Sequence, residues 1–583
     1  MAKFPRPLPR IATGLSDSWR AGYGLSDLRH DLMAGLTIGT VAVPLSMALA
    51  IATGVPPQHG LYTAIVAGAI IALTGGSRFN VSGPTAAFVA ILFPIVQQFG
   101  LGGLLVATLM AGIILVAMGI SGLGRLIQFV PYPVVLGFTA GIAVVIAMLQ
   151  VPDFLGLNQL EMGEHFFSNL ARLATATVQF DPTATLIGSW TLVLLLLWPR
   201  LGLPIPAPLA GLVLASLAVF AINRWSGIEV ETIASRFTWE AQGEHGKGIP
   251  PLAPSFILPW QLPGPDGNPL LLNFALFQAL LGPAFAIAML AAIESLLCAV
   301  VADGLTRTRH DPNAELIGQG LGNIVAPLFG GITATAAIAR TATNVRSGAR
   351  SPLAAVIHAA VVLLAVIGLA GLLGLVPMAA LAALLLVVAW NMSEARHVWH
   401  TLRSAPAGDV TILLLCFVLT VVFDMVLAVA VGTGLAAALF IRRMALLTST
   451  QRLEENHALT ENLPRETVVY DIDGPLFFAA AEKALHTLRH VDAGIRTVIL
   501  DMRDVPSMDG TAIAALGSLV NEIQHQGAAL ILVGLPPRII LKLRRAGIRT
   551  RRGKLSHRAT LETARTLAWR WREGLVDLPA RSA

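Results

Sequence analysis

The composition of this 583-residue chain excludes a wholly soluble protein, because 55% of its residues are hydrophobic and only 13% are charged. Soluble domains carry roughly 25% charged residues. The formal net charge of +6 is modest and no motif joins basic to aromatic residues, so we expect no nucleic-acid partner. The two cysteines, Cys298 and Cys416, lie in apolar runs and offer neither a disulfide framework nor metal-ligand spacing, so we expect no metal and no cofactor.

The order of polar and apolar segments predicts a membrane domain followed by a soluble one. A polar arm at residues 1–30 precedes the first apolar run, so no cleaved signal is expected. Residues 31–443 contain about fourteen hydrophobic segments, some of which, such as 101–120, are long enough to span a bilayer. A linker at 444–463 and a soluble tail at 464–583 follow. We expect a multi-pass α-helical protein of a bacterial inner (plasma) membrane.

The charges of the loops favour cytoplasmic termini. With the N-terminus inside, the loop arginines fall on the cytoplasmic side: Arg125, Arg200, Arg307, Arg309, Arg396, Arg403, Arg442 and Arg443. The loops assigned to the outside carry acids with few balancing cations: Asp153, Glu161, Glu164, Glu229, Glu231, Glu240 and Glu244. This distribution follows the positive-inside rule and places the tail in the cytoplasm as well.

Two segments, residues 77–88 and 330–341, have the pattern of an extended stretch that leads into half a helix. Both contain Thr-Ala-Ala before a large apolar residue, and they lie about 250 residues apart, as corresponding segments of two halves would. Half-helix N-termini that meet inside a membrane bind an anion through their N–H groups. Thr85, Ala86 and Ala87 would let the anion approach the backbone closely. Helix packing by small residues is the competing explanation.

Two charged residues lie within this apolar sequence. Arg340 would cost about 2.5–3.5 kcal/mol at the centre of a spanning helix, so a role in attracting an anion is favoured over pairing or contact with the cytoplasm. Glu294 is the most isolated acid in an apolar run; it would bind a cation, take up a proton or pair, for example with Arg340. Six further polar residues cluster in the sequence and are interpreted as a solvated turn followed by a capped helix: Asp303, His310, Asp311, Glu315, Gln319 and Asn323.

Several strings together form a recognisable set: Gly35-Leu36-Thr37 through Pro44, Gly60-Leu61-Tyr62, Ser77-Arg78 through Val81-Ser82-Gly83-Pro84-Thr85, Val301-Ala302-Asp303-Gly304, Glu315-Leu316-Ile317-Gly318-Gln319-Gly320 and Arg340-Thr341-Ala342-Thr343-Asn344. This set resembles the SulP anion-transporter family, which is solute carrier family 26 in animals. The resemblance implies fourteen transmembrane segments as seven plus seven inverted repeats, with core and gate domains, elevator-like alternating access and a homodimer.

The same resemblance implies the site residues. Substrate would be bound by Leu45, Ser46, Leu49, Thr85, Ala86, Ala87, Ile338, Ala339, Arg340 and Thr341, and ion coupling would involve Glu294 and Cys298. A sodium-coupled bicarbonate branch has a hydroxyl residue where this chain has Cys298, so a proton is favoured over sodium as the coupling ion.

Other strings resemble the bacterial C4-dicarboxylate branch, which transports succinate, fumarate and aspartate. They are residues 332–345, 388–395 and 474–482. Proton-coupled dicarboxylate uptake is therefore the expected activity, with sulfate and bicarbonate as alternative substrates. An uncoupled anion channel or exchanger, a voltage-responsive motor and a membrane-tethered receptor are further alternatives, and an enzyme is not expected.

The soluble tail has the pattern of an α/β domain. Residues 467–472, 498–502 and 529–533 are predicted strands, and 512–524 and 539–546 are predicted helices. The tail resembles the STAS domain, whose phosphorylatable hydroxyl would correspond to Thr511. Asp509 and Thr511 could regulate, but capping of the following helix is the favoured role. A cytoplasmic partner or a dimer contact is expected for this domain.

Overall fold

The computed structural model describes most of the chain. The described residues are 10–127, 130–157, 160, 162–163, 165–176, 179–203, 205–241, 243–423, 425–446, 448–453, 462–477, 481, 484–485 and 494–574. The chain forms two compact units, Met1–Gly434 and Leu435–Ala583, here called the N-terminal and C-terminal units. The division falls inside one helix, α18 (Met425–Leu446).

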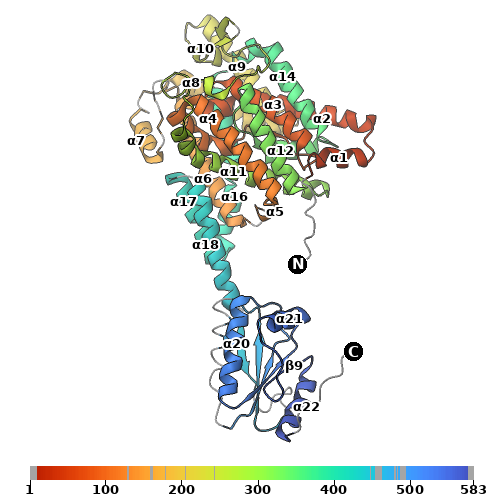
Figure 1. Cartoon of the computed structure of the whole chain (residues 1–583). Helices are drawn as coiled ribbons and strands as arrows, with labels where there is room; N and C mark the ends of the chain where they lie inside the picture. Colours follow the sequence, from red (N-terminus) through yellow and green to blue (C-terminus); the bar gives the residue numbers. More distant parts are fainter. Residues whose placement is uncertain are drawn as a thin grey trace. The chain divides into compact units, whose positions relative to one another are not determined.

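The N-terminal unit is helical (Figure 1). Its helices are α1 (Thr13–Arg20), α2 (Leu25–Ala52), α3 (Pro57–Thr74), α4 (Val89–Ser121), α5 (Gly124–Ile127), α6 (Tyr132–Leu155), α7 (Phe166–Ala176), α8 (Pro182–Leu197), α9 (Ala207–Trp225), α10 (Ile233–Arg236), α11 (Phe274–Thr306), α12 (Pro312–Val325), α13 (Ile338–Arg346), α14 (Leu353–Leu373), α15 (Met378–Met392), α16 (Ala395–Ser404) and α17 (Ala407–Val422). Its strands are β1 (Ser82–Gly83), β2 (Thr238–Ala241), β3 (Glu244–Lys247) and β4 (Thr335–Ala336).

Length and hydropathy make this unit a membrane domain. Within the described residues, nine helices are long and apolar enough to cross a bilayer, and α17 is a shorter apolar helix. Helix α4 contains a break at Gly100, whose φ of 67° is not helical, so the stretch that α4 covers is two helical segments. The predicted polytopic helical fold is confirmed, whereas the number of fourteen crossings stays a prediction.

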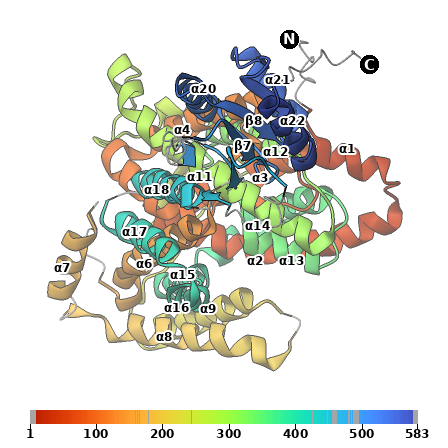
Figure 2. The ribbon, with the colours of Figure 1, turned by 90° about the horizontal axis from the view of Figure 1, so that it is seen from below.

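The helices pack as two groups. In the first group α4 packs on α11 and α12, α14 packs on α2 and α3, and α13 packs on α11 and α2. In the second group α15 and α17 pack on α6, and α8 packs on α9 and α15. Figure 2 shows α2, α13 and α14 close together and α6, α15 and α17 close together. The interrupted segments belong to the first group.

Two glycines let α4 and α12 approach closely. A Cβ atom placed on Gly112 of α4 would lie 2.7 Å from the carbonyl oxygen of Gly320, and one on Gly320 of α12 would lie 2.7 Å from the carbonyl oxygen of Gly112. The backbones of the two helices are therefore in direct contact, as is common where small residues meet in membrane helices.

The loops predicted to lie outside are better balanced in charge than the sequence indicated. Arg236 of α10 forms ion pairs with Asp153, at 2.6 Å, and with Glu231. Burial of the guanidinium lowers the pKa of Arg236, but the hydrogen bonds and negative charges of Glu231 and Asp153 raise it by more, so the net shift is upward. Glu161 and Glu164 lie outside the described residues.

The C-terminal unit is an α/β domain around a five-stranded sheet, β5-β6-β7-β8-β9. The strands are β5 (Ser449–Arg452), β6 (Thr467–Asp473), β7 (Thr497–Asp501), β8 (Ala529–Val533) and β9 (Leu555–Arg558); β5 is antiparallel to β6 and the other pairs are parallel. The predicted strands and helices of the tail are all present, with ends shifted by a few residues at most.

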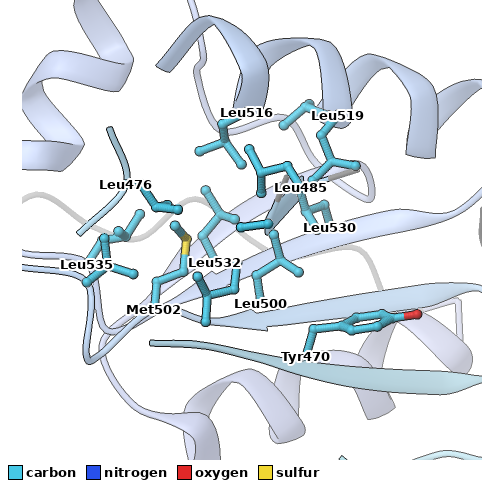
Figure 3. Close-up of a cluster of buried hydrophobic side chains, with 14 of the residues drawn as sticks. Tyr470, Leu476, Leu485, Leu500, Met502, Leu516, Leu519, Leu530, Leu532 and Leu535 are labelled. Carbon is cyan, nitrogen blue, oxygen red and sulfur yellow. The ribbon is translucent and has the colours of Figure 1, made fainter. Parts of the chain in front are cut away.

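Helices cover both faces of this sheet. On one face, α20 (Gly510–His525) and α21 (Pro537–Arg545) contribute to a buried cluster that includes Leu500, Leu516 and Leu532 (Figure 3). On the other face, α22 (Leu561–Arg572) packs on Ile499 and Ile531. Because both faces are covered, β7 and β8 are continuous buried runs rather than alternating ones.

We predict that Gly320→Ala destabilises the N-terminal unit by about 1–3 kcal/mol, because the added methyl group would force α4 and α12 apart. The measurement is the thermal unfolding midpoint of the purified protein in detergent. Gly304→Ala is the matched control, since Gly304 is also helical and its Cβ position has no atom within 4 Å. Equal midpoints for the two variants would contradict the close helix contact.

Candidate functional site

The two interrupted segments meet in the structure. Strand β1 pairs with β4 in antiparallel fashion, with Ser82 opposite Ala336 and Gly83 opposite Thr335. The pairing is extended by a hydrogen bond of 3.0 Å from the Ala337 N–H to the Val81 carbonyl. The predicted meeting of the two segments is therefore observed, and both are broken rather than continuous helices.

Each strand leads directly into a helical start. After β1 the chain is extended at Thr85, turns through a short 3-10 helix, η1 (Ala86–Phe88), and continues as α4. After β4 it is extended at Ala337 and continues as α13. The N–H groups at a helix start have no partner within the helix and carry a partial positive charge. The β1–β4 ladder thus brings two such starts to one place.

Arg340 joins the two segments. It lies in the first turn of α13, is 3% exposed, and donates a hydrogen bond from Nη2 to the carbonyl oxygen of Pro84. Its Nε and Nη1 have no hydrogen-bond partner. A Cβ atom on Gly83 would lie 2.6 Å from Nη1, so glycine is needed there for the guanidinium to lie against β1. A buried cation with unsatisfied donors is suited to binding an anion.

Glu294 lies beside the first segment and forms no direct ion pair with Arg340. Its Oε2 accepts a hydrogen bond of 3.0 Å from the hydroxyl of Thr85, and the side chain is partly exposed. The two charges interact electrostatically, but the Arg340 guanidinium donates its hydrogen bond to the Pro84 carbonyl rather than to Glu294. The pairing of these two charges that the sequence left open is therefore absent from the structure.

Cys298 lies one turn from Glu294 on α11 and contacts the second segment. Its Sγ donates to Thr341 Oγ1 at 3.0 Å, and the same oxygen accepts from the Val81 N–H at 3.0 Å. Both Cys298 and Thr341 are fully buried. Helix α11 is therefore bound to both interrupted segments, through Thr85 on one side and Thr341 on the other.

The other predicted site residues occupy different environments. Ser46 and Leu49 of α2 are buried, Leu45 is half-buried, and the Ser46 hydroxyl has no hydrogen-bond partner. Helix α2 packs on α13. Ala86 and Ala87 are buried next to Thr85, whereas Ile338 is 42% exposed and Ala339 is also exposed. Ile338 and Ala339 therefore differ in exposure from Arg340, which follows them in the first turn of α13.

A buried carboxylate that the sequence analysis placed in a solvated turn holds the first segment. Glu315 of α12 is 1% exposed. It accepts hydrogen bonds from the N–H groups of Gly76 and Ser77, both at 2.9 Å, and from the side-chain amides of Asn80, at 2.8 Å, and Gln319, at 3.1 Å. The solvated interpretation is wrong for Glu315, Gln319 and Asn323, which are all buried, although Asp311 does cap α12 as predicted.

The same face of α12 contacts both segments. Gln319 donates to the Ser82 hydroxyl at 3.1 Å. Asn323 forms a reciprocal pair of 2.8 Å hydrogen bonds with the N–H and carbonyl of Ala334. Polar residues four apart on an otherwise apolar helix share one face, and this spacing was the signal that the sequence offered. These residues position both strands and were missed as site residues.

In the C-terminal unit, Asp509 caps α20 by accepting a hydrogen bond of 2.8 Å from the Ala512 N–H. Thr511 is exposed in the first turn of that helix. The cap that the sequence favoured for Asp509 is present.

The architecture defines a class. A many-helix membrane domain in which two broken segments cross next to a buried, partly unpaired arginine is the arrangement of an anion carrier. Residues 28–416 match the sulfate permease family and residues 460–558 match the STAS domain. The chain belongs to the sulfate permease family, and it is accordingly an anion transporter and not an enzyme.

Relatives and solved structures agree with this assignment. "Putative sulfate transporter YvdB" of Bacillus subtilis is 41% identical over 91% of this chain and 96% of its own length. "Bicarbonate transporter BicA" of Picosynechococcus sp. is 30% identical over 87% of this chain and 89% of its own. The solved transmembrane domain of a cyanobacterial BicA covers 70% of this chain and 98% of its own, with a TM-score of 0.60 and 29% identity.

A second solved structure is similar to nearly the whole chain, including the C-terminal unit. The murine solute carrier 26 family member A9, solved in an inward-facing state, covers 94% of this chain and 92% of its own, with a TM-score of 0.73 and 18% identity. At that identity the comparison supports the fold alone.

We predict that Glu315→Gln destabilises the N-terminal unit by about 1–3 kcal/mol, because an amide cannot accept all the hydrogen bonds that this buried carboxylate accepts. Thermal unfolding in detergent measures the loss, and anion uptake should fall with it. Glu229→Gln is the control, since Glu229 is exposed. Unchanged unfolding and uptake in Glu315→Gln would show that this carboxylate does not hold the first segment.

Proposed function

We propose that this chain is a secondary active transporter that couples the uptake of a small oxyanion to the entry of protons. The observation that carries the proposal is the Arg340 guanidinium, which is buried between two helix starts and keeps unpartnered donors at Nε and Nη1. An unpaired buried cation is costly in a membrane protein unless it has a function. An anion seated against β1 and α13 would satisfy those donors together with the helix-start N–H groups.

The substrate that we propose first is sulfate, because the relative that is 41% identical bears that name. Bicarbonate is the second candidate, since a relative at 30% identity transports it by its name. Succinate, fumarate and aspartate remain proposals that rest on sequence resemblance. Two helix starts could each hold one carboxylate of a C4-dicarboxylate, so the site does not exclude these larger anions.

A proton is proposed as the coupling ion. Glu294 is close to the first helix start through Thr85, where its negative charge would oppose an arriving anion. Protonation removes that charge, so the anion and the proton would bind together. A sodium ion would need several oxygen ligands around Glu294. The nearby Cys298 is engaged with Thr341 and supplies sulfur rather than oxygen.

The two helix groups suggest how the site would reach both sides of the membrane. The first group, which includes α2, α4 and α11–α14, carries the interrupted segments; η1 contacts α6 and α15 of the second group. We propose that the first group moves as a core against the second group as a gate, in an elevator-like alternation. We also propose cytoplasmic termini in a bacterial inner membrane, a homodimer, and a cytoplasmic regulatory role for the STAS domain around Asp509 and Thr511.

We predict that Arg340→Gln raises the half-saturating anion concentration about 10- to 100-fold, because a charge-assisted hydrogen bond is lost. The measurement is uptake of labelled sulfate, bicarbonate, succinate, fumarate and aspartate into proteoliposomes. Arg346→Gln is the control, since Arg346 is exposed on the same helix. If none of these anions is taken up by the unmodified protein, the proposed substrates are wrong.

A second prediction separates coupling from binding. An inward proton gradient, and not a sodium gradient, should drive anion accumulation by the unmodified protein. Glu294→Gln should lose this accumulation but keep anion exchange at equal pH, because a permanently neutral side chain can no longer carry the proton. Glu394→Gln, at an exposed position, should retain both. Gradient-driven uptake that survives in Glu294→Gln would assign coupling elsewhere, and uptake indifferent to any gradient would identify a channel or an uncoupled exchanger.

A further inference from the structure

A second cavity with cationic walls lies within the N-terminal unit, on the side where α2 begins and α11 ends. Its volume is about 460 Å³, which is within the range of clefts that bind small molecules. Its walls include Tyr23, Asp27, Arg78, Thr308 and Arg350, which come from the start of α2, the stretch before β1 and the stretches after α11 and α13. The cavity shares no lining residue with the anion site around Arg340.

The two arginines of this cavity are unpaired. Arg78 is half-buried and Arg350 is exposed. Neither guanidinium has a hydrogen-bond or ion-pair partner among the residues that the structure describes. Because a partly buried charge is costly without a partner, oxygen atoms of a ligand in the cavity would stabilise Arg78.

The N-terminal arm holds the wall that carries Arg78. The Gly14 N–H donates a hydrogen bond of 3.3 Å to the carbonyl oxygen of Gly75. A Cβ atom on Gly14 would lie 2.5 Å from the carbonyl oxygen of Ser77, so the first turn of α1 is in direct contact with the residue that precedes Arg78. The backbone at Arg78 is therefore fixed by the arm.

A buried carboxylate holds the wall that carries Arg350. Asp31 accepts hydrogen bonds from the hydroxyl of Tyr23, at 2.8 Å, and from the N–H of Arg350, at 2.6 Å. Asp31 does not itself line the cavity. Asp27 is the one acid among the described residues that do, and its carboxylate accepts a hydrogen bond from the Gly24 N–H. The lining thus has two cations and one anion.

We propose that this cavity binds the phosphate group of a phosphate monoester, either a soluble one or the headgroup of a phospholipid. A guanidinium binds phosphate through two parallel hydrogen bonds. Arg78 and Arg350 belong to different walls, and a tetrahedral phosphate offers oxygen atoms in several directions, whereas a carboxylate offers both of its oxygen atoms to one side. An inorganic phosphate would fill only part of the cavity, which leaves room for the alcohol to which the phosphate is esterified.

The position of the cavity is accessible to both kinds of monoester. Tyr23, which lines it, stacks on Trp19 with ring centroids 5.9 Å apart, and Trp19 is 62% exposed. Helix α2 begins two residues after Tyr23 and is apolar and long enough to span a membrane. Aromatic residues at the end of a span lie at the level of the lipid headgroups, where water is also present.

Ordinary loop charge does not account for both arginines. Cations are common where spans end, and the exposed residues Arg307, Arg309 and Arg346 fit that explanation. Arg78 differs from them, because it is half-buried in a wall that the contact with Gly14 fixes.

The test is calorimetric titration of the full chain in detergent with dioctanoyl phosphatidic acid, glycerol 3-phosphate and dioctanoyl phosphatidylcholine. The first two probes carry the same phosphate monoester and differ in their acyl chains, so tighter binding of phosphatidic acid identifies a lipid as the ligand and equal affinity identifies a soluble ester. Phosphatidylcholine, whose headgroup has no net charge, should bind about 10-fold or more weakly than phosphatidic acid. Binding of neither monoester, or equal binding of the two lipids, would overturn the proposal.

Substitutions locate the ligand. Arg78→Gln and Arg350→Gln together should weaken binding of phosphatidic acid about 100-fold, because each lost charge-assisted hydrogen bond costs about tenfold in affinity. Arg350→Gln alone, at an exposed position, should weaken it about 10-fold and keeps the test valid if the double variant does not fold. The control pair Arg29→Gln and Arg346→Gln removes the same charge from exposed positions outside the cavity and should retain the affinity. Equal losses in the two pairs would contradict a site in this cavity.

Arg340→Gln separates this cavity from the transport site and should retain binding of the monoesters. If binding is lost in Arg340→Gln but kept in the variant of Arg78 and Arg350, the ligand occupies the transport site and the proposal is wrong. The readout is binding rather than anion uptake, so the result does not depend on the proposed transport activity.

Discussion

The antiparallel ladder between β1 and β4 is the constraint on which the transport domain depends. It joins residues that lie about 250 positions apart in the sequence, Gly83 and Thr335, and so fixes the two halves of the domain to each other at their interrupted segments. Interrupting a helix inside a membrane leaves backbone groups without partners, which is tolerated only where protein supplies them. Here β1 and β4 supply hydrogen-bond partners for each other's backbone groups.

Helix α12 supplies the rest. Glu315, Gln319 and Asn323 lie on one face and bind the backbone or side chains of both segments. Because buried polar groups are costly when unpaired, this face makes the broken conformation the stable one. The close α4–α12 contact through Gly112 and Gly320 brings the polar face within reach of the strands. The Nε and Nη1 donors of Arg340 remain without hydrogen-bond partners, and the proposed anion site is based on these unsatisfied donors.

The two units follow different physical rules. In the N-terminal unit, each helix forms its own backbone hydrogen bonds. Buried polar side chains of α12 surround the place where β1 and β4 pair. In the C-terminal unit, a sheet is covered on both faces by helices and most charged side chains are exposed, with buried Asp501 as an exception.

The sequence by itself determined that this is a polytopic membrane protein, because long apolar runs are a local property, and the family followed from the resemblance of its motifs. It also identified Thr85, Glu294 and Arg340 as unusual, and it located the strands and helices of the tail, whose periodicity is plain. Only the tertiary structure decided that Glu294 bonds Thr85 rather than Arg340, and that Glu315 is buried instead of solvated. Those outcomes depend on which distant hydrogen-bond donors, hydroxyl, amide or backbone N–H, each carboxylate meets after packing, and no local pattern encodes that meeting.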